Sequence, residues 1–162
     1  MLGEHSAWCK VQLFEPAARI PLLIRSPDHP ASHGKRARTF AESIDLLPTL
    51  ASLVGLHSSL PTNGSDGVSL VAAFNNSSQM IKHAAVTQVP RCLLPSPAPS
   101  WEDNICGGRG WDGDLFNFTA MGYSVRTAEW RLTLWMPWDA AIEAVDWNTA
   151  RPIGIELYNH TG

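Results

Sequence analysis

The most regular hydrophobic pattern lies in the second half of the chain. Residues 131–136 read Arg-Leu-Thr-Leu-Trp-Met, so that apolar and polar side chains alternate. Such alternation is typical of a half-buried β-strand. Together with residues 123–127 it predicts a β-hairpin, and residues 153–158 predict a final strand with Ile153, Ile155 and Leu157 on one face.

The clearest helical pattern lies between residues 45 and 55. Asp45 suits the N-terminal cap, and Pro48 falls in the first turn, where its missing N–H costs nothing. Gly55 suits the left-handed C-terminal position. The apolar residues at helical spacing, which predict the face turned to the core, are Leu47, Leu50, Ala51 and Val54.

Shorter runs complete the expected elements. Residues 20–24 read as a mostly buried strand, 68–74 as a short helix and 84–88 as a strand. The first half is therefore predicted to be an α/β layer, and the second half antiparallel strands with long loops. The first half has only one convincing strand, and a single strand cannot form a sheet by itself. We therefore expect the chain to be a piece of a larger protein.

Composition excludes several classes of protein. The 162 residues include 44% hydrophobic and 17% charged residues, with a formal charge of −3. The chain has no strong basic field that could hold a phosphate backbone, so nucleic acid is not expected as a partner. No apolar run approaches the length of about 20 residues that a membrane span needs, and seven Trp residues disfavour disorder.

Five of the seven asparagines begin an Asn-x-Ser/Thr triplet. The excess favours a secretory-pathway glycoprotein, with chance in Ser-rich loops as the alternative. The opening residues contain no signal peptide, so this interpretation implies a missing leader. Asn75 and Asn76 overlap, and the predicted glycosylation sites are Asn63, Asn75, Asn117 and Asn159.

The three cysteines, Cys9, Cys92 and Cys106, match no zinc-binding spacing. Cys92 and Cys106 flank a Pro-rich stretch and are the preferred candidates for a disulfide. A partner cysteine outside this chain and three unpaired thiols are the open alternatives.

Several separated stretches carry a resemblance to one known family. They are Leu-Gly-Glu-His-Ser-Ala-Trp-Cys-Lys (2–10), Arg-Ile-Pro-Leu-Leu-Ile (19–24), Asp-Leu-Leu-Pro-Thr-Leu (45–50), Gly-Val-Ser-Leu (67–70), Met-Gly-Tyr-Ser-Val-Arg-Thr (121–127), Trp-Arg-Leu-Thr-Leu-Trp (130–135) and Glu-Leu-Tyr (156–158). In order and approximate spacing they resemble the sulfatases of the alkaline phosphatase superfamily. Among these enzymes they are most similar to members that act on glycosaminoglycan-type sulfated sugars.

The resemblance implies an α/β fold, of which this chain is a C-terminal fragment. Residues 1–80 would complete the large α/β domain, and residues 81–162 would form the smaller C-terminal subdomain with antiparallel strands. The missing N-terminal part of the same enzyme would be a partner. The family motif Cys-x-Pro-x-Arg, which supplies the formylglycine nucleophile, has no match here. Calcium is implied as the cofactor of the intact enzyme, with ligands outside this chain, so the fragment alone is expected to be inactive.

The same resemblance assigns three site residues. Lys10 matches the family lysine that contacts the substrate sulfate and is the candidate catalytic residue, with a solvated surface lysine as the alternative. His5 and Trp8 are candidate substrate-binding residues, with structural packing as the alternative. Ser6 replaces a usual Gly, and a positive φ there would strain the loop. The sequence offers no candidate metal ligand set.

The implied function is the removal of sulfate from a sulfated saccharide, in a lysosomal or secreted enzyme. The alternative is a non-catalytic secreted glycoprotein module that binds carbohydrate or protein. Its contact surface would come from the Trp-rich hairpin, through Trp130, Trp135, Trp138 and Trp147.

Overall fold

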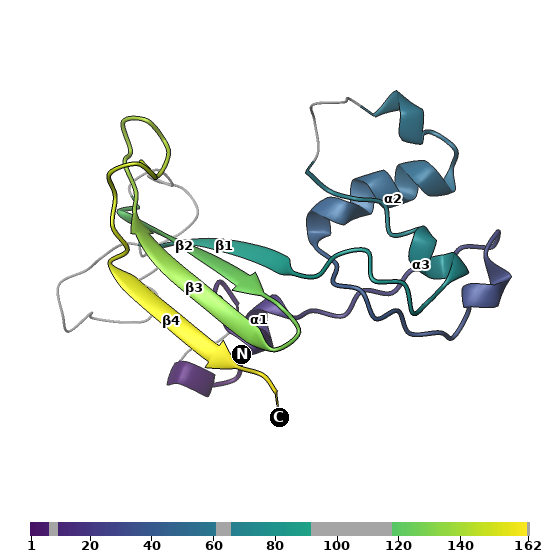
Figure 1. Ribbon diagram of the computed structural model, residues 1–162, viewed down its shortest axis with the longest axis horizontal. Helices are drawn as coiled ribbons and strands as arrows, with labels where there is room; N and C mark the ends of the chain where they lie inside the picture. The colour runs from purple at the N-terminus through teal and green to yellow at the C-terminus, as the bar shows by residue number, and fades with distance from the viewer. Residues whose placement is uncertain (7–9, 61–65, 92–117, 162) are drawn as a thin grey trace. The chain divides into compact units, whose positions relative to one another are not determined.

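The computed structural model describes residues 1–6, 10–60, 66–91 and 118–161 (Figure 1). The chain divides into two compact units. One contains Met1–Pro21 and Val86–Gly162, and the other contains Leu22–Ala85. The first 21 residues therefore group with the C-terminal sheet in this chain, whereas the predicted boundary lay at residue 80. The division of the sulfatase domains at residue 80 stays a prediction.

The sheet-bearing unit is built on four strands in the order β1-β2-β3-β4. Their bounds are Ala85–Arg91 for β1, Ala120–Arg126 for β2, Trp130–Pro137 for β3 and Gly154–Asn159 for β4. β3 pairs antiparallel with both β2 and β4 (Figure 1). The predicted hairpin, the final strand and the antiparallel pairing are confirmed, whereas the larger α/β domain and the C-terminal subdomain stay predictions.

Along much of this sheet the buried face is the polar one. Ser124 pairs with Thr133 in register, and the two residues are 0% and 1% exposed. On the opposite face Leu132 pairs with Leu157, and these are 38% and 62% exposed. The alternation is as predicted, but the apolar side chains are not the covered ones. The polar face is buried because it has hydrogen-bonding partners there, including the carboxylate of Glu15.

The apolar face of the sheet is covered only at the end of the hairpin where β2 begins and β3 ends. Met121, Met136 and Val145 form a buried cluster there. The partly buried side chains that pack against this cluster are Phe118, Tyr123, Leu134, Trp138 and Ala150. A core therefore forms where residues 138–150 fold back over the sheet.

The second unit contains the helices α2 (Leu46–Leu53) and α3 (Ala72–Asn75) (Figure 1). The predicted core face of α2 is wrong except at Ala51. Leu47 and Leu50 are 57% and 54% exposed, whereas Thr49 is fully buried. The reason is that Thr49 Oγ1 donates to Asp45 O at 2.6 Å and accepts the Leu70 N–H at 2.9 Å, which turns that side of the helix inward.

Asp45 does not act as the predicted side-chain cap of α2. It ends the 3₁₀ helix η3 (Ser43–Asp45) and is fully buried. Its carboxylate accepts the N–H groups of Glu42 at 2.8 Å and Val68 at 2.9 Å, and Lys82 Nζ lies 3.1 Å from Oδ1. Asp45 thus joins three separate segments of the second unit.

Two other predicted elements differ in the structure. Residues 20–24 form no strand, and Ile20 and Leu23 are 68% and 88% exposed, because no other described strand pairs with this stretch. The helix predicted over 68–74 is shortened to α3. The remaining short helices are η1 (Glu4–Ser6), α1 (Glu15–Ala18), η2 (Pro30–Ser32) and η4 (His57–Ser59).

Candidate functional site

Lys10 begins a short segment that lies on the polar face of the sheet and ends in α1. Its side chain is exposed. The next residue, Val11, has φ 68°. A β-branched residue in the left-handed region is strained by about 1–3 kcal/mol, and such strain persists only where neighbouring contacts hold it. The chain therefore turns sharply directly after Lys10.

Arg91, at the end of β1, contacts this turn. Its Nη2 atom donates to Val11 O at 2.5 Å and to Gln12 Oε1 at 2.8 Å. The guanidinium also lies 5.6 Å from the ring centroid of Trp135, at cation–π distance. Burial lowers the pKa of the Arg91 guanidinium below its ordinary value. An arginine remains charged at neutral pH after such a shift.

Glu15 attaches the other end of the segment to the hairpin. Its carboxylate accepts from Arg131 and from Arg126 Nε, the latter at 3.3 Å. Burial raises the pKa of Glu15, but the hydrogen bond and charge of Arg131 outweigh it, so that the pKa lies below 4.5. Arg131 itself is buried and also donates to Ser124 Oγ at 3.0 Å. Arg19 Nη1 also lies 3.8 Å from Glu15 Oε1, so one carboxylate faces three guanidinium groups and the net charge of this cluster is positive.

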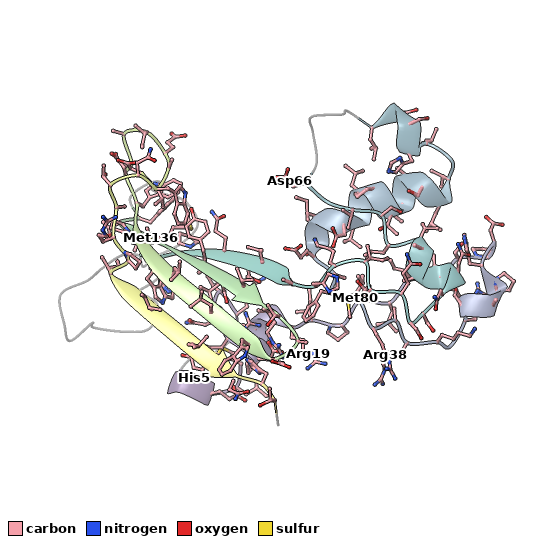
Figure 2. The ribbon with its side chains drawn as sticks, in the orientation of Figure 1. His5, Arg19, Arg38, Asp66, Met80 and Met136 are labelled. Carbon is pink, nitrogen blue, oxygen red and sulfur yellow. The ribbon has the colours of Figure 1, made fainter. Side chains whose placement is uncertain are left out.

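His5 is held by aromatic contacts. Its ring stacks on Phe14 with centroids 3.9 Å apart, and Phe14 meets Tyr158 edge-on at 5.9 Å. Figure 2 shows His5 beside the C-terminal end of β4. His5, and not its neighbour Ser6, has a positive φ, of 54°.

The structure describes two of the three predicted site residues, His5 and Lys10. His5 and Lys10 are both exposed, on one N-terminal segment that packs against the sheet. Trp8 lies outside the described residues, as do all three cysteines and the sequons at Asn63 and Asn117. Asn75 and Asn159 are exposed, as glycan acceptors need to be.

The four tryptophans of the alternative interpretation have different surroundings. Trp138 packs against Phe118 and Trp147 against Tyr123. Trp135 donates from Nε1 to Glu156 Oε1 at 2.6 Å, and Trp130 is 41% exposed at the start of β3. These contacts give each indole a separate structural setting.

Calcium, which the resemblance implies, does not fit the residues described. Within them, no three His, Cys, Asp or Glu side chains group closely enough to hold a metal ion.

No described helix has the length and hydropathy that a bilayer crossing needs.

No sequence motif marks Glu15, Arg91 or Arg131 as functional residues. Arg91 and Arg131 meet partners 79 to 116 positions away in the chain, so local spacing gave no signal for them. The only local hint was the charge of Arg131 at a strand position that alternates with apolar residues.

Comparison with known proteins identifies relatives of one kind. No protein-family profile matches the chain. Iduronate 2-sulfatase of Mus musculus is 28% identical over 181 residues, which covers 85% of this chain and 30% of the relative. The Homo sapiens iduronate 2-sulfatase is 25% identical over 177 residues, with 83% and 30% covered. Choline-sulfatase of Rhizobium meliloti (strain 1021) is 41% identical over 76 residues, or 46% of this chain and 14% of the relative.

The homologues of this chain are therefore sulfatases, as the sequence resemblance predicted. The chain spans only 30% of the length of the iduronate 2-sulfatases that it matches.

Proposed function

We propose that this chain, whose homologues are sulfatases, is the part of a sulfuric ester hydrolase that contributes a sulfate-binding lysine, Lys10. The observation that carries the proposal is the similarity to iduronate 2-sulfatase over 85% of the chain. The exposed side chain of Lys10 supports it, because an ammonium group that is to meet a substrate must be accessible.

The proposed role of Lys10 follows from the chemistry of sulfate ester hydrolysis. Negative charge rests on the sulfuryl oxygens and develops on the leaving alkoxide as the S–O bond breaks. A positioned ammonium group stabilises such charge electrostatically, and in favourable cases one such donor accounts for a factor of about 10²–10³ in rate. His5 would donate a hydrogen bond to a substrate oxygen.

The nucleophile and the cation belong, in this proposal, to other parts of the enzyme. The chain contains neither Cys-x-Pro-x-Arg nor Ser-x-Pro-x-Arg. A formylglycine nucleophile would therefore have to come from outside the 162 residues. Since the described residues do not fit calcium, no step of the reaction is assigned to a metal bound by this chain.

We further propose a sulfated sugar of the glycosaminoglycan type as the substrate. The two iduronate 2-sulfatases match 85% and 83% of the chain and act, by name, on iduronate 2-sulfate, whereas choline-sulfatase matches 46% of the chain. A lysosomal or secreted location accompanies this substrate class. The exposed sequons at Asn75 and Asn159 support that location.

The first test is a binding and turnover experiment on the purified 162-residue chain. We expect no hydrolysis of an aryl sulfate or of a 2-O-sulfated heparin disaccharide, because the chain has no nucleophile motif. In ¹H–¹⁵N spectra the disaccharide should shift the amides around Lys10, and K10Q should weaken its binding about tenfold. K35Q, which removes the same charge from an exposed lysine of the other unit, is the matched control. Clear turnover, or equal binding by K10Q and the wild type, would contradict the proposal.

Choline sulfate and an unsulfated disaccharide separate the remaining alternatives. Binding of choline sulfate but not of the sulfated disaccharide would overturn the substrate class. Equal binding of sulfated and unsulfated disaccharides, insensitive to K10Q, would favour the carbohydrate-binding glycoprotein module. The genomic sequence upstream of Leu2 is a second test, because a sulfatase should encode Cys-x-Pro-x-Arg there.

A further inference from the structure

We propose that Arg91 is a positioning residue for Lys10, which it orients by holding the strained peptide of Val11. This inference rests on the proposed function of Lys10 and assigns a role to a residue of β1 that is 81 positions away in the sequence. Arg91 does not touch the substrate in this proposal. It acts through the backbone.

Arg91 binds the backbone at Val11 and the side chain of Gln12. A single atom, Arg91 Nη2, donates both to Val11 O and to the Gln12 side chain, at 2.5 and 2.8 Å. These bonds hold the carbonyl that follows the unusual φ of 68°. A hydrogen bond from a charged donor is stronger than one between neutral groups, and its contribution is comparable with the cost of a left-handed Val. The Arg91 bonds are therefore strong enough to offset the strain.

Arg91 is itself supported by other residues of the sheet. Its guanidinium lies over the Trp135 ring, and Trp135 Nε1 is fixed by Glu156 on β4. The arginine is thus braced by β3 and β4 as well as by its own strand. A donor with a fixed direction can select one backbone conformation of the peptide that it binds.

The rest of the segment is anchored separately. Leu13 is 4% exposed, and Glu15 is held by Arg131 and Arg126. The two arginines that hold Glu15 are separate from Arg91. Loss of Arg91 should therefore free residues 10–12 alone, so that Val11 relaxes toward extended backbone and Lys10 changes direction.

The test compares R91Q, R91K and R151Q in the full 162-residue chain. R151Q removes the same charge from an exposed site of the same unit and serves as the control. In R91Q we expect ¹⁵N order parameters of Lys10 and Val11 to fall from a rigid value of about 0.85 to below about 0.6. The amides of Leu13 and Glu15 should keep their order. R91K, which keeps one cationic donor, should restore part of the order, and R151Q should change nothing.

A binding measurement completes the test. R91Q should weaken binding of the 2-O-sulfated disaccharide by a factor of about 5 to 10, without direct contact between Arg91 and the ligand. If R91Q loses its fold, R91K provides the same comparison at smaller amplitude. Unchanged order of Lys10 and Val11 in a folded R91Q or R91K variant would overturn the positioning role, whatever the binding result. Failure of the wild-type chain to bind the disaccharide would instead overturn the proposed function, and the order parameters would still decide the role of Arg91.

Discussion

At the scale of single residues, the polar face of the sheet depends on charges that are paired across long sequence distances. Glu15 accepts from two arginines of the hairpin, and Glu156 accepts from both Trp135 and Tyr158. These contacts lower the pKa of Glu15 and raise the pKa of Tyr158. The stability of the sheet-bearing unit should therefore depend on pH in a predictable direction.

Glu15 should contribute to stability above its unfolded pKa and lose that contribution in acid. Its pKa lies below the ordinary 4.5 in the folded chain, so the unfolded chain takes up the proton first as the pH falls. We expect E15Q to lower the free energy of unfolding by about 2 kcal/mol at pH 7, and by progressively less as the pH falls below 4.5. Urea unfolding between pH 3 and 7 measures this, with the exposed Glu129 as the control in E129Q. A gap between E15Q and the wild type that stays constant down to pH 3 would refute the assignment.

Tyr158 should titrate far above an ordinary tyrosine. Its hydroxyl donates to Glu156 Oε2 at 2.7 Å, and this bond, with burial and the carboxylate charge, raises the pKa of Tyr158 to about 12. The raised pKa means that this stabilisation is present below pH 10 and is lost as the pH rises toward 12. The chain has only two tyrosines, so absorbance at 295 nm can follow them. E156Q should return the Tyr158 titration toward 10.0, and an unchanged titration would show that Glu156 is not the cause.

At the scale of elements, the periodic patterns located β3, β4 and α2, whereas the short apolar run at residues 20–24 formed no strand. The period of two predicted β3 and β4 correctly, because the alternation is a property of the extended backbone itself. That period did not determine which of the two faces of a strand is buried. Thr49 on α2 and Arg131 on β3 face inward because each finds hydrogen-bonding partners there, while the leucines next to them stay exposed.

A pair of leucine substitutions tests this arrangement of the second unit. Leu70 is 5% exposed and Leu50 is 54% exposed. L70A should lower the free energy of unfolding by about 3 kcal/mol because it leaves a cavity, whereas L50A should cost no more than about 0.5 kcal/mol. Chemical unfolding of both variants provides the comparison. Equal losses would mean that the exposed face of α2 is covered by contacts other than those described.

At the scale of the whole chain, the contacts separate into two units that each have their own buried residues. Leu70 and Ala73 are buried in the Leu22–Ala85 unit, and Met121 and Met136 are buried in the unit that bears the sheet. Units with separate cores need not unfold together.

We therefore expect calorimetry of the chain to show two unfolding transitions. L70A should lower the midpoint of one transition on the order of 10 °C, and M136A should lower the other by a similar amount. Each variant should leave the second transition unchanged. A single transition that both variants shift would show that the two units unfold as one.

The sequence by itself determined the local features of this protein: the hairpin, the last strand, the position of α2 and the resemblance to sulfatases. Backbone periodicity and short motifs depend only on residues that are close together in the sequence, so they can be predicted without knowledge of the fold. The tertiary structure decided which faces are buried, the joining role of Asp45 and the attachment of the Lys10 segment through Arg91 and Glu15. Those features depend on partners tens of residues apart, because a buried polar group is stable only where the folded chain brings it a hydrogen-bonding partner.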